Sequence, residues 1–281
     1  MTSGPRQSML CPNCRKLISA DEPLCPYCGM TAPGSWWKNN FLTRGFGNSD
    51  LFIRAIIYTN IGMYVITLLF DPRISGLSMN PFTYLAPDGK SLLLLGATGT
   101  IPIERLHRWW TIVSANYLHG SILHILFNMM AFRQLAPVVA REYGNYRTIS
   151  IYTLGGACGF WISYLAGVTF TIGASAAVCS LIGAILYYGK SRGGIYGQRI
   201  YKQVGAWALG IFLFGFIVPG INNWGHGGGM VAGICLGFLL GYREKKTEKF
   251  FHKALAAACA VVTVSILAWA VSSGIYYRIA G

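Results

Sequence analysis

A polar group interrupts the apolar sequence at "TIGASAAVCSLIGA", residues 171–184. Ser175 stands there at the beginning of a long apolar run, and a serine hydroxyl becomes a strong nucleophile when a nearby base takes its proton. His226 is a candidate base, and it also stands at the beginning of an apolar run. A third polar group comprises His119, His124 and Asn128. These residue types predict nucleophilic catalysis with hydrogen-bond donors for an oxyanion.

The composition places these polar groups in a membrane protein. Of 281 residues, 53% are hydrophobic and only 11% are charged, whereas soluble domains carry roughly a quarter charged residues. The net charge of +14 comes from basic residues that gather between apolar runs, which indicates membrane orientation rather than nucleic-acid binding. The first 40 residues contain no apolar core of a signal peptide, so we expect a cytoplasmic amino terminus.

Seven apolar stretches are long enough to cross a bilayer, and they predict an all-α polytopic membrane protein. They lie near residues 52–70, 112–135, 147–167, 175–189, 204–219, 226–242 and 254–275. Basic residues follow the second, fourth and sixth stretches, whereas "AGVTFTIGA" and "PGINNWG" contain none. The positive-inside rule then predicts an external carboxyl terminus. Residues 70–108 are expected to form an external loop that rests partly in the outer leaflet.

The polar residues fall at one predicted depth. The second, fourth and sixth spans are expected to run from outside to inside, so their amino-terminal ends share the outer side. His124 and Asn128 are one turn apart and share a helix face, from which His119 is rotated away. A small-xxx-small stripe in the sixth span permits close approach between helices, and it comprises Gly225, Gly229, Gly233 and Gly237. We therefore expect His226 to reach Ser175.

This arrangement predicts a specific mechanism. His226 takes the proton of Ser175, and His124, Asn128 and the Ser175 backbone N–H stabilise the oxyanion together with the helix amino terminus. No Asp or Glu lies in the body of a predicted span, which indicates a dyad rather than a triad. Each residue alone has an ordinary structural interpretation, because serines bond to their own helix and histidines pair across helices. A transporter would need midplane polar residues and an internal repeat, and we find neither.

Three stretches resemble the rhomboid intramembrane proteases. "HRWWTIVSANYLHGSILHILFNMMAF" resembles the second-helix signature, in which His119 is followed after four residues by His124 and after three more by Asn128. "GASAAVCSLIGA" resembles the Gly-x-Ser-Gly motif around the nucleophile. "GHGGGMVAG" resembles the His-x-x-Gly-x-x-x-Gly motif around the base. The resemblance covers about residues 50–245.

The resemblance implies a six-helix rhomboid core with a seventh carboxyl-terminal helix. It implies that Ser175 is the nucleophile and His226 the general base. It implies an oxyanion site of His124, Asn128 and Ser175, and supporting roles for His119, Gly173, Gly229 and Gly233. Arg108 and Trp109 match an Arg- or Trp-containing structural motif.

The implied substrates are single-span membrane proteins, cut near the outer end of their helix, and catalysis needs no cofactor. Ala176 departs from the family, which usually has Gly after the nucleophile, and Gly225 and Gly229 are expected to absorb the extra methyl. The alternative is a catalytically inactive rhomboid-like protein that binds membrane clients. The compact form suggests a bacterial plasma membrane.

The amino-terminal sequence predicts a separate metal-binding head. "CPNCRKLISADEPLCPYCG" contains two Cys-x-x-Cys turns separated by ten residues, and they supply Cys11, Cys14, Cys25 and Cys28. Four thiolates at this spacing are typical of a structural Zn²⁺ site, and a cytoplasmic location disfavours two disulfides. A head as short as this needs the metal for its folding energy. The sequence is equally consistent with a second role, in which the head docks a partner that the sequence does not identify. The predicted organisation is a zinc-ribbon-like head (1–32), a linker with an interfacial anchor (33–50), the six-helix core (51–245) and the seventh helix with its tail (246–281).

Overall fold

The computed structural model describes residues 8–12, 16–35, 49–71, 80, 83–218 and 220–280. The chain divides into two compact units, Met1–Phe52 and Ile53–Gly281. Each unit has its own packing and is described by itself.

The first unit contains a small antiparallel hairpin. Strand β1 (Ser8–Leu10) pairs with β2 (Leu17–Ser19), so that Met9 lies opposite Ile18. Ile18 is buried and packs with Cys11 and Cys25, while Met9 and Met30 pack at the edge of this cluster. The few apolar side chains of this unit therefore gather around its cysteines.

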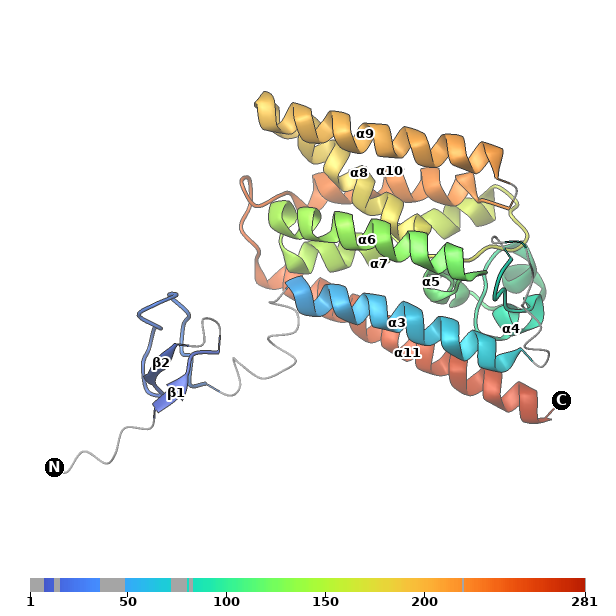
Figure 1. The fold of residues 1–281 in the computed structure, drawn as a ribbon, viewed down its shortest axis with the longest axis horizontal. Helices are drawn as coiled ribbons and strands as arrows, with labels where there is room; N and C mark the ends of the chain where they lie inside the picture. The colour runs from blue at the N-terminus through green and yellow to red at the C-terminus, as the bar shows by residue number, and fades with distance from the viewer. Residues whose placement is uncertain are drawn as a thin grey trace. The chain divides into compact units, whose positions relative to one another are not determined.

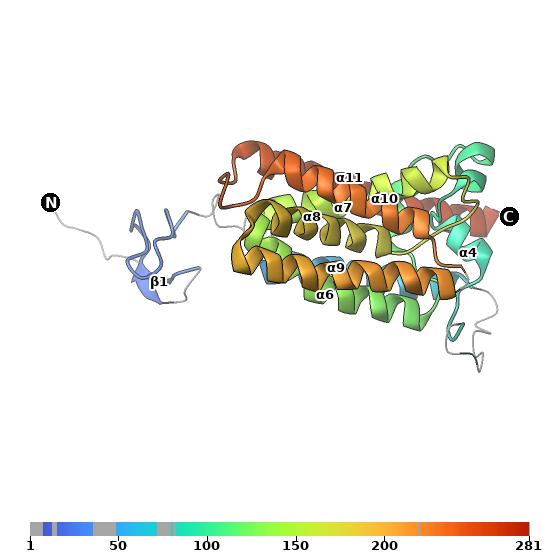
Figure 2. The same cartoon turned by 90° about the horizontal axis from the view of Figure 1, so that it is seen from above.

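The second unit is built from long helices that run side by side (Figures 1 and 2). The described residues form seven helices of 18 residues or more: α3 (Ser49–Phe70), α6 (Ile122–Tyr143), α7 (Asn145–Leu165), α8 (Ser175–Arg192), α9 (Gly194–Ile217), α10 (Asn223–Leu240) and α11 (Phe250–Ala280). Each predicted span falls on one of these helices, so the all-α polytopic fold is confirmed. Figure 1 shows α9 at one edge of the bundle and α3 with α11 at the other.

Four of the seven helices are long and apolar enough to cross a membrane by length and composition, namely α3, α6, α9 and α11. The other three, α7, α8 and α10, contain more glycine and polar residues and pack chiefly against one another. Most side chains of α8 are buried in the protein. Helix α10 instead buries mainly its glycines and leaves Val231, Phe238 and Leu239 exposed. Helix α8 is therefore the central helix of the bundle.

Glycines close the turns between consecutive helices. Gly144, with φ of +97°, separates α6 from α7, and Gly193, with φ of +68°, separates α8 from α9. These left-handed conformations favour glycine and reverse the chain in a single residue. As a result α6, α8 and α10 all run in one direction. We call the end where these three helices begin the site end, and the opposite end the basic end.

The second predicted span, 112–135, is wrong in its boundaries. The chain there forms α5 (Thr111–Ser114), a 3₁₀ turn η2 (Ala115–Tyr117) and an extended segment before α6 begins. Ser121 caps α6 by accepting a hydrogen bond from the His124 N–H, which fixes the start of the helix. His119 therefore precedes the helix instead of lying on its outer half.

The predicted external loop contains a short helix of its own. Its sequence "SLLLLGA" forms most of α4 (Gly89–Leu94) and the segment after it, and Asp88 caps that helix. Leu92, Leu95 and Ala97 are buried inside the protein. A π-helical turn η1 (Ile101–Arg105) follows. This part of the loop therefore packs against the bundle.

Candidate functional site

Ser175 is the first residue of α8, and the backbone before it is held from two sides. The Gly173 N–H donates to the Ala115 carbonyl at 2.8 Å. Thr171 exchanges two backbone hydrogen bonds with Thr98, at 2.7 and 3.0 Å. Gly173 has φ of +123°, a conformation that disfavours any other residue. The half-exposed Ser175 thus stands at a fixed position at the site end.

His124 lies in the first turn of α6 and packs against the chain just before Ser175. The Gly120 N–H donates to His124 Nδ1 at 3.2 Å, so the neutral imidazole carries its proton on Nε2. A Cβ placed on Gly173 would lie 2.7 Å from His124 Nε2 and 3.7 Å from Ser175 Oγ. The Nε2–H donor therefore points to the region beside the serine hydroxyl, and only glycine at 173 leaves it room.

Asn128 and His119 lie on either side of His124 in the sequence. Asn128 Nδ2 donates to the His124 carbonyl at 2.8 Å, which leaves its second N–H available. The His119 ring is fully buried and lies edge-on to the His124 ring, with centroids 5.1 Å apart. Neither ring nitrogen of His119 has a hydrogen-bond partner among the described residues. His119 thus supports His124 by packing in this structure.

His226 lies in the first turn of α10, with 7% of its surface exposed. Its Nδ1 is buried without a hydrogen-bond partner in the described part of the chain. No hydrogen bond joins His226 to the Ser175 hydroxyl in this structure, and the two residues lie on adjoining turns of helices in contact.

The glycine stripe of α10 explains that contact. A Cβ on Gly229 would overlap the carbonyl oxygen of Ala176, and one on Gly233 would overlap the carbonyl oxygen of Ser180. A Cβ on Gly237 would lie 2.7 Å from the Tyr143 hydroxyl. The backbones of α8 and α10 approach so closely that no side chain fits between them along this line.

The methyl group of Ala176 lies against α7, a helix that the sequence analysis did not connect with it. Gly159 of α7 faces it, because a Cβ on Gly159 would lie 3.0 Å from the Ala176 methyl and 2.8 Å from the Gly225 carbonyl oxygen. Ala176 is 1% exposed and packs with Ala115 and Phe160. Gly159 thus gives room to this methyl at a junction of three helices, which Gly225 and Gly229 also border.

Sequence reasoning missed the residue that positions the start of α10. Asn222 Oδ1 accepts from the Gly225 N–H at 2.9 Å and caps the helix. Its Nδ2 donates to Ser163 Oγ at 2.8 Å and to Thr171 Oγ1 at 3.0 Å. One side chain therefore ties the start of α10 to α7 and to the segment before Ser175. An Asn just before an apolar run is the capping signal that could have identified it.

Arg108 and Trp109 stabilise the segment that leads into α5. Arg108 Nη1 donates to the Leu93 carbonyl at 3.1 Å, and its guanidinium lies over the Tyr277 ring of α11. The Trp109 ring packs against the rings of Trp161 and Tyr164 at centroid distances of 5.7 and 5.4 Å. Both residues therefore have structural contacts.

The head contains a candidate metal centre. The sulfur atoms of Cys11, Cys25 and Cys28 lie within 4.8 Å of one another, and the first two side chains are buried. The Cys25 N–H donates to the Met30 carbonyl, and Gly29, with φ of +70°, donates back to the Cys25 carbonyl at 2.9 Å. Cys14, the fourth predicted ligand, lies outside the described residues. The three converging thiols could hold a metal ion, and thiolate ligands suit Zn²⁺.

Comparisons with known proteins agree with the sequence motifs. A family model described as "Rhomboid domain" matches residues 106–243. RHOMBOID-like protein 4 of Arabidopsis thaliana is 27% identical over 225 residues, which cover 72% of this chain and 57% of that protein. Rhomboid protease GluP of Bacillus subtilis is 29% identical over 201 residues, 72% of this chain and 37% of that protein. RHOMBOID-like protein 6, mitochondrial, of Arabidopsis thaliana is 29% identical over 204 residues, 69% of this chain and 66% of that protein.

These similarities support membership of the rhomboid family and an integral membrane location. The matched residues 106–243 contain α5 to α10 and so include every residue of the candidate site in the membrane body. Helices α3 and α11 lie outside the matched range. The chain spans less than two thirds of the length of these three relatives.

Proposed function

We propose that this protein is an intramembrane serine endopeptidase of the rhomboid type that uses Ser175 and His226 as a catalytic dyad. His226 takes the Ser175 proton, the hydroxyl oxygen attacks a peptide carbonyl, and the protonated His226 returns the proton to the leaving amine. Water then hydrolyses the acyl-enzyme by the same route in reverse. The substrates are single-span membrane proteins cut near the end of their helix at the site end.

One observation carries this proposal: Gly229 lets α10 touch the backbone of Ala176. Because Ala176 follows Ser175 and Gly229 stands three residues after His226, this contact brings the base and the nucleophile onto adjoining turns. A rotation of the Ser175 side chain toward His226 would complete the hydrogen bond. Hydrogen bonds at catalytic pairs commonly tighten only when substrate is bound.

The neighbouring residues supply the oxyanion site. With its Nδ1 occupied by the Gly120 N–H, His124 offers Nε2–H beside Ser175. The second N–H of Asn128 and the backbone N–H of Ser175 at the start of α8 complete the set. Preorganised donors of this kind supply about 2.7–4 kcal/mol each to acyl transfer. The helix amino terminus adds positive potential at the same place.

The test is cleavage of a single-span reporter by the full chain in liposomes. We expect the wild-type protein to cut the reporter near one end of its transmembrane helix, and Ser175→Ala and His226→Ala to be inactive. Covalent labelling of Ser175 by a fluorophosphonate provides a second readout that requires no correct substrate. Labelling that depends on His226 supports the dyad even if no reporter is cut.

A client-binding protein without protease activity is the second candidate. Two observations favour it: Ala176 stands where rhomboid proteases usually have Gly, and the Ser175–His226 hydrogen bond is not formed. It predicts that folded wild-type protein captures single-span clients but neither cuts them nor reacts with the fluorophosphonate. That result would replace the protease proposal.

We propose further that Cys11, Cys14, Cys25 and Cys28 hold a structural Zn²⁺. The convergence of three described sulfurs and the turn around Gly29 support this assignment. We expect about one zinc per chain by elemental analysis, and its loss in Cys25→Ser. Retention of all zinc in Cys25→Ser would contradict a site of four cysteine ligands.

We also propose the orientation indicated by the basic residues, with the amino terminus in the cytoplasm and the site end and carboxyl terminus outside. The exposed cations Arg192, Lys245, Lys246, Lys249 and Lys253 all lie at the basic end. Reporter tags at the two termini, tested for protease access in sealed vesicles, decide the orientation. The bacterial plasma membrane remains a proposal, since the relatives come from a bacterium and from a plant.

A further inference from the structure

The end of helix α11 contacts two segments that are distant in the sequence. Arg278 Nη1 donates to the Leu69 carbonyl at 3.2 Å, and its guanidinium lies 5.5 Å from the centroid of the Phe70 ring. The Arg108 guanidinium lies over the neighbouring Tyr277 ring, 5.6 Å from its centroid. One turn of α11 therefore contacts both the end of α3 and the segment that leads into α5.

Gly274 brings the backbone of α11 close to the ends of α3 and α4. A Cβ placed on Gly274 would lie 3.0 Å from the Phe70 ring and 3.4 Å from the Leu95 side chain. Leu95 directly follows α4 and is fully buried. Figure 1 shows this end of α11 on the same side of the bundle as α4. We call residues 274–278 the α11 strap, because they contact the ends of both helices.

Arg108 connects the α11 strap with α4 and α5. Its Nη1 donates to the Leu93 carbonyl at 3.1 Å, while its guanidinium faces the Tyr277 ring. Its own carbonyl oxygen accepts from the Thr111 N–H at 3.1 Å and lies 2.6 Å from the Thr111 hydroxyl oxygen. Thr111 is the first residue of α5. The side chain and backbone of Arg108 therefore join three helices.

The contacts continue from α5 to the two segments that precede the candidate catalytic residues. The Thr111 hydroxyl is buried and lies 3.0 Å from the Thr98 hydroxyl. Thr98 exchanges two backbone hydrogen bonds with Thr171, which stands four residues before the candidate nucleophile. Thr171 Oγ1 also accepts from Asn222, which caps the helix of the candidate base. A continuous series of contacts therefore leads from Tyr277 to both sides of the candidate site.

We propose that Tyr277 is a positioning residue for the candidate site and that it acts through Arg108. The negative face of an aromatic ring attracts a guanidinium, so the Tyr277 ring restricts the Arg108 side chain to one place. Loss of the ring frees that side chain, loosens its bond to the Leu93 carbonyl and lets the Thr98–Thr171 pairing open more often. Displacement of a reacting group by about 1 Å lowers a rate about 100-fold, so a small loosening is measurable. The effect on cleavage rests on the proposed function.

The α11 strap comes from outside the part of the chain that matches the family model. Residues 106–243 match the Rhomboid domain, whereas α11 begins at Phe250. Tyr277 therefore acts on Arg108, inside the matched range, from an additional helix. The proposal gives this seventh helix a role in the candidate site.

Three variants isolate the contribution of the ring. Tyr277→Leu removes the aromatic face, and because Tyr277 is 53% exposed, the change leaves the packed core intact. Tyr277→Phe keeps the aromatic face and should behave like the wild type. Tyr276→Leu is the matched control, because Tyr276 is 66% exposed and no guanidinium lies over its ring in the described part of the chain. The melting temperature of each variant in detergent should stay close to that of the wild type.

Amide hydrogen exchange of the full chain in detergent measures the positioning without any need for activity. We expect Tyr277→Leu to speed exchange of the Thr98 and Thr171 N–H groups about 2- to 5-fold, in line with the strength of a partly exposed cation–π contact. The Tyr146 N–H, which donates to Glu248 at the basic end, should exchange at the wild-type rate. Unchanged exchange at Thr98 and Thr171, or faster exchange that includes Tyr146, would overturn the proposal.

Cleavage of the single-span reporter in liposomes then tests the consequence for the reaction. We expect Tyr277→Leu to lower kcat by at least about 2-fold and to leave KM unchanged, because the change acts on the catalytic arrangement and not on substrate binding. A normal kcat in a variant with faster exchange would overturn the positioning role. If the wild-type protein neither cuts the reporter nor reacts with the fluorophosphonate, the protease proposal fails, and the exchange rates alone decide whether Tyr277 orders the candidate site.

Discussion

The two ends of the helix bundle differ in what their buried polar groups contact. At the site end, His119, Asn223 and His226 each keep at least one buried polar atom without a partner among the described residues. At the basic end, Arg147 Nε and the Tyr188 hydroxyl also lack a partner there, but charged side chains bind backbone groups and one another. The same helices, α6, α8 and α10, contribute to both ends, so the difference lies in the local side chains and loops.

The basic end is held by a buried arginine and a capping carboxylate. Arg147 is fully buried and donates to the carbonyls of Tyr143, Lys246 and Thr247 at 2.8–2.9 Å. Glu248 accepts from the Tyr146 and Arg147 N–H groups at 3.1 and 3.3 Å, which caps α7. Together they fasten the loop before α11 to the core.

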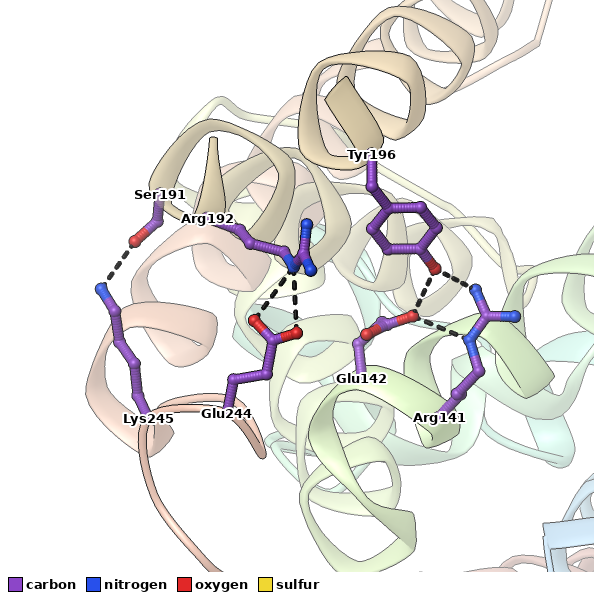
Figure 3. Close-up of polar contacts among 7 residues, drawn as sticks. All are labelled: Arg141, Glu142, Ser191, Arg192, Tyr196, Glu244 and Lys245. Carbon is purple, nitrogen blue, oxygen red and sulfur yellow. Dashed lines mark hydrogen bonds and ion pairs between the residues drawn. The ribbon is translucent and has the colours of Figure 1, made fainter. Parts of the chain in front are cut away.

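A second set of contacts lies nearer the surface of the same end (Figure 3). Glu142 accepts from Arg141 Nε at 2.8 Å and from the Tyr196 hydroxyl at 2.7 Å. Arg192 Nε donates to both Glu244 oxygens at 3.0 Å, and Lys245 Nζ donates to Ser191 Oγ at 2.9 Å. These contacts connect α6 to α9, and the end of α8 to the loop after α10.

The comparison predicts that the basic end contributes stability and that the site end is available for chemistry. A satisfied network fixes one arrangement of the chain, whereas unpaired imidazole atoms keep donors and acceptors available for a substrate. Substitutions at the basic end should therefore change stability, and substitutions of the site side chains should change activity. Four experiments test this division, beginning with the largest expected effect.

Replacement of the nucleophile or the base should separate activity from stability most clearly. We expect Ser175→Ala and His226→Ala to lower the cleavage rate by about 1,000-fold or more, as for other serine nucleophiles and their bases. The midpoint of unfolding by SDS should stay close to that of the wild type, because neither side chain carries a structural hydrogen bond. A large loss of stability in both variants would contradict the division.

At Gly229, near the site end, a substitution should lower both the cleavage activity and the stability. Gly229→Ala places a methyl on the Ala176 carbonyl and pushes α10 away from α8. A displacement of about 1 Å lowers rates by about 100-fold, and overpacking costs about 1–3 kcal/mol of stability. Gly227→Ala is the control, since its methyl would meet only the Phe212 ring, at 3.4 Å. Equal activity of the two variants would show that the close helix contact is not needed.

Arg147→Ala should affect stability without affecting the chemical step. It leaves three carbonyl oxygens without their donor and opens a cavity, so we expect a loss on the order of 3 kcal/mol in the free energy of unfolding. The activity of the fraction that remains folded should be close to normal. Arg141→Ala is the control, because the Arg141 side chain is 63% exposed and its ion pair contributes little. A reduced rate in fully folded Arg147→Ala would mean that the two ends are coupled.

Ala176→Gly should have the smallest effect of the four. It removes a methyl that Gly159 already accommodates, so we expect an activity change of less than about tenfold and a stability loss of about 1 kcal/mol. The single-turnover rate with a reporter measures the first, and SDS unfolding the second. A rise in activity of 100-fold or more would show that Ala176 limits this protein and would favour the client-binding role in the wild type.

The sequence by itself determined the number and order of the long helices. Apolar run length is a local property, and it identified all seven helices although only four are apolar enough to be spans by composition alone. The three motifs around His124, Ser175 and His226 also came from local spacing. Local spacing also predicted the close packing of the α10 glycines, because a four-residue repeat of small side chains marks one face of a helix.

The tertiary structure decided what the motifs touch. The break that puts His119 before α6 follows from the Ser121 cap and the turn η2, which the apolar pattern of 112–135 conceals. Gly159 became the neighbour of Ala176, and Asn222 the tie to Ser163, only through contacts between distant parts of the chain. Such contacts depend on how helices rotate against one another, and a single helix sequence does not encode its rotation relative to a neighbour.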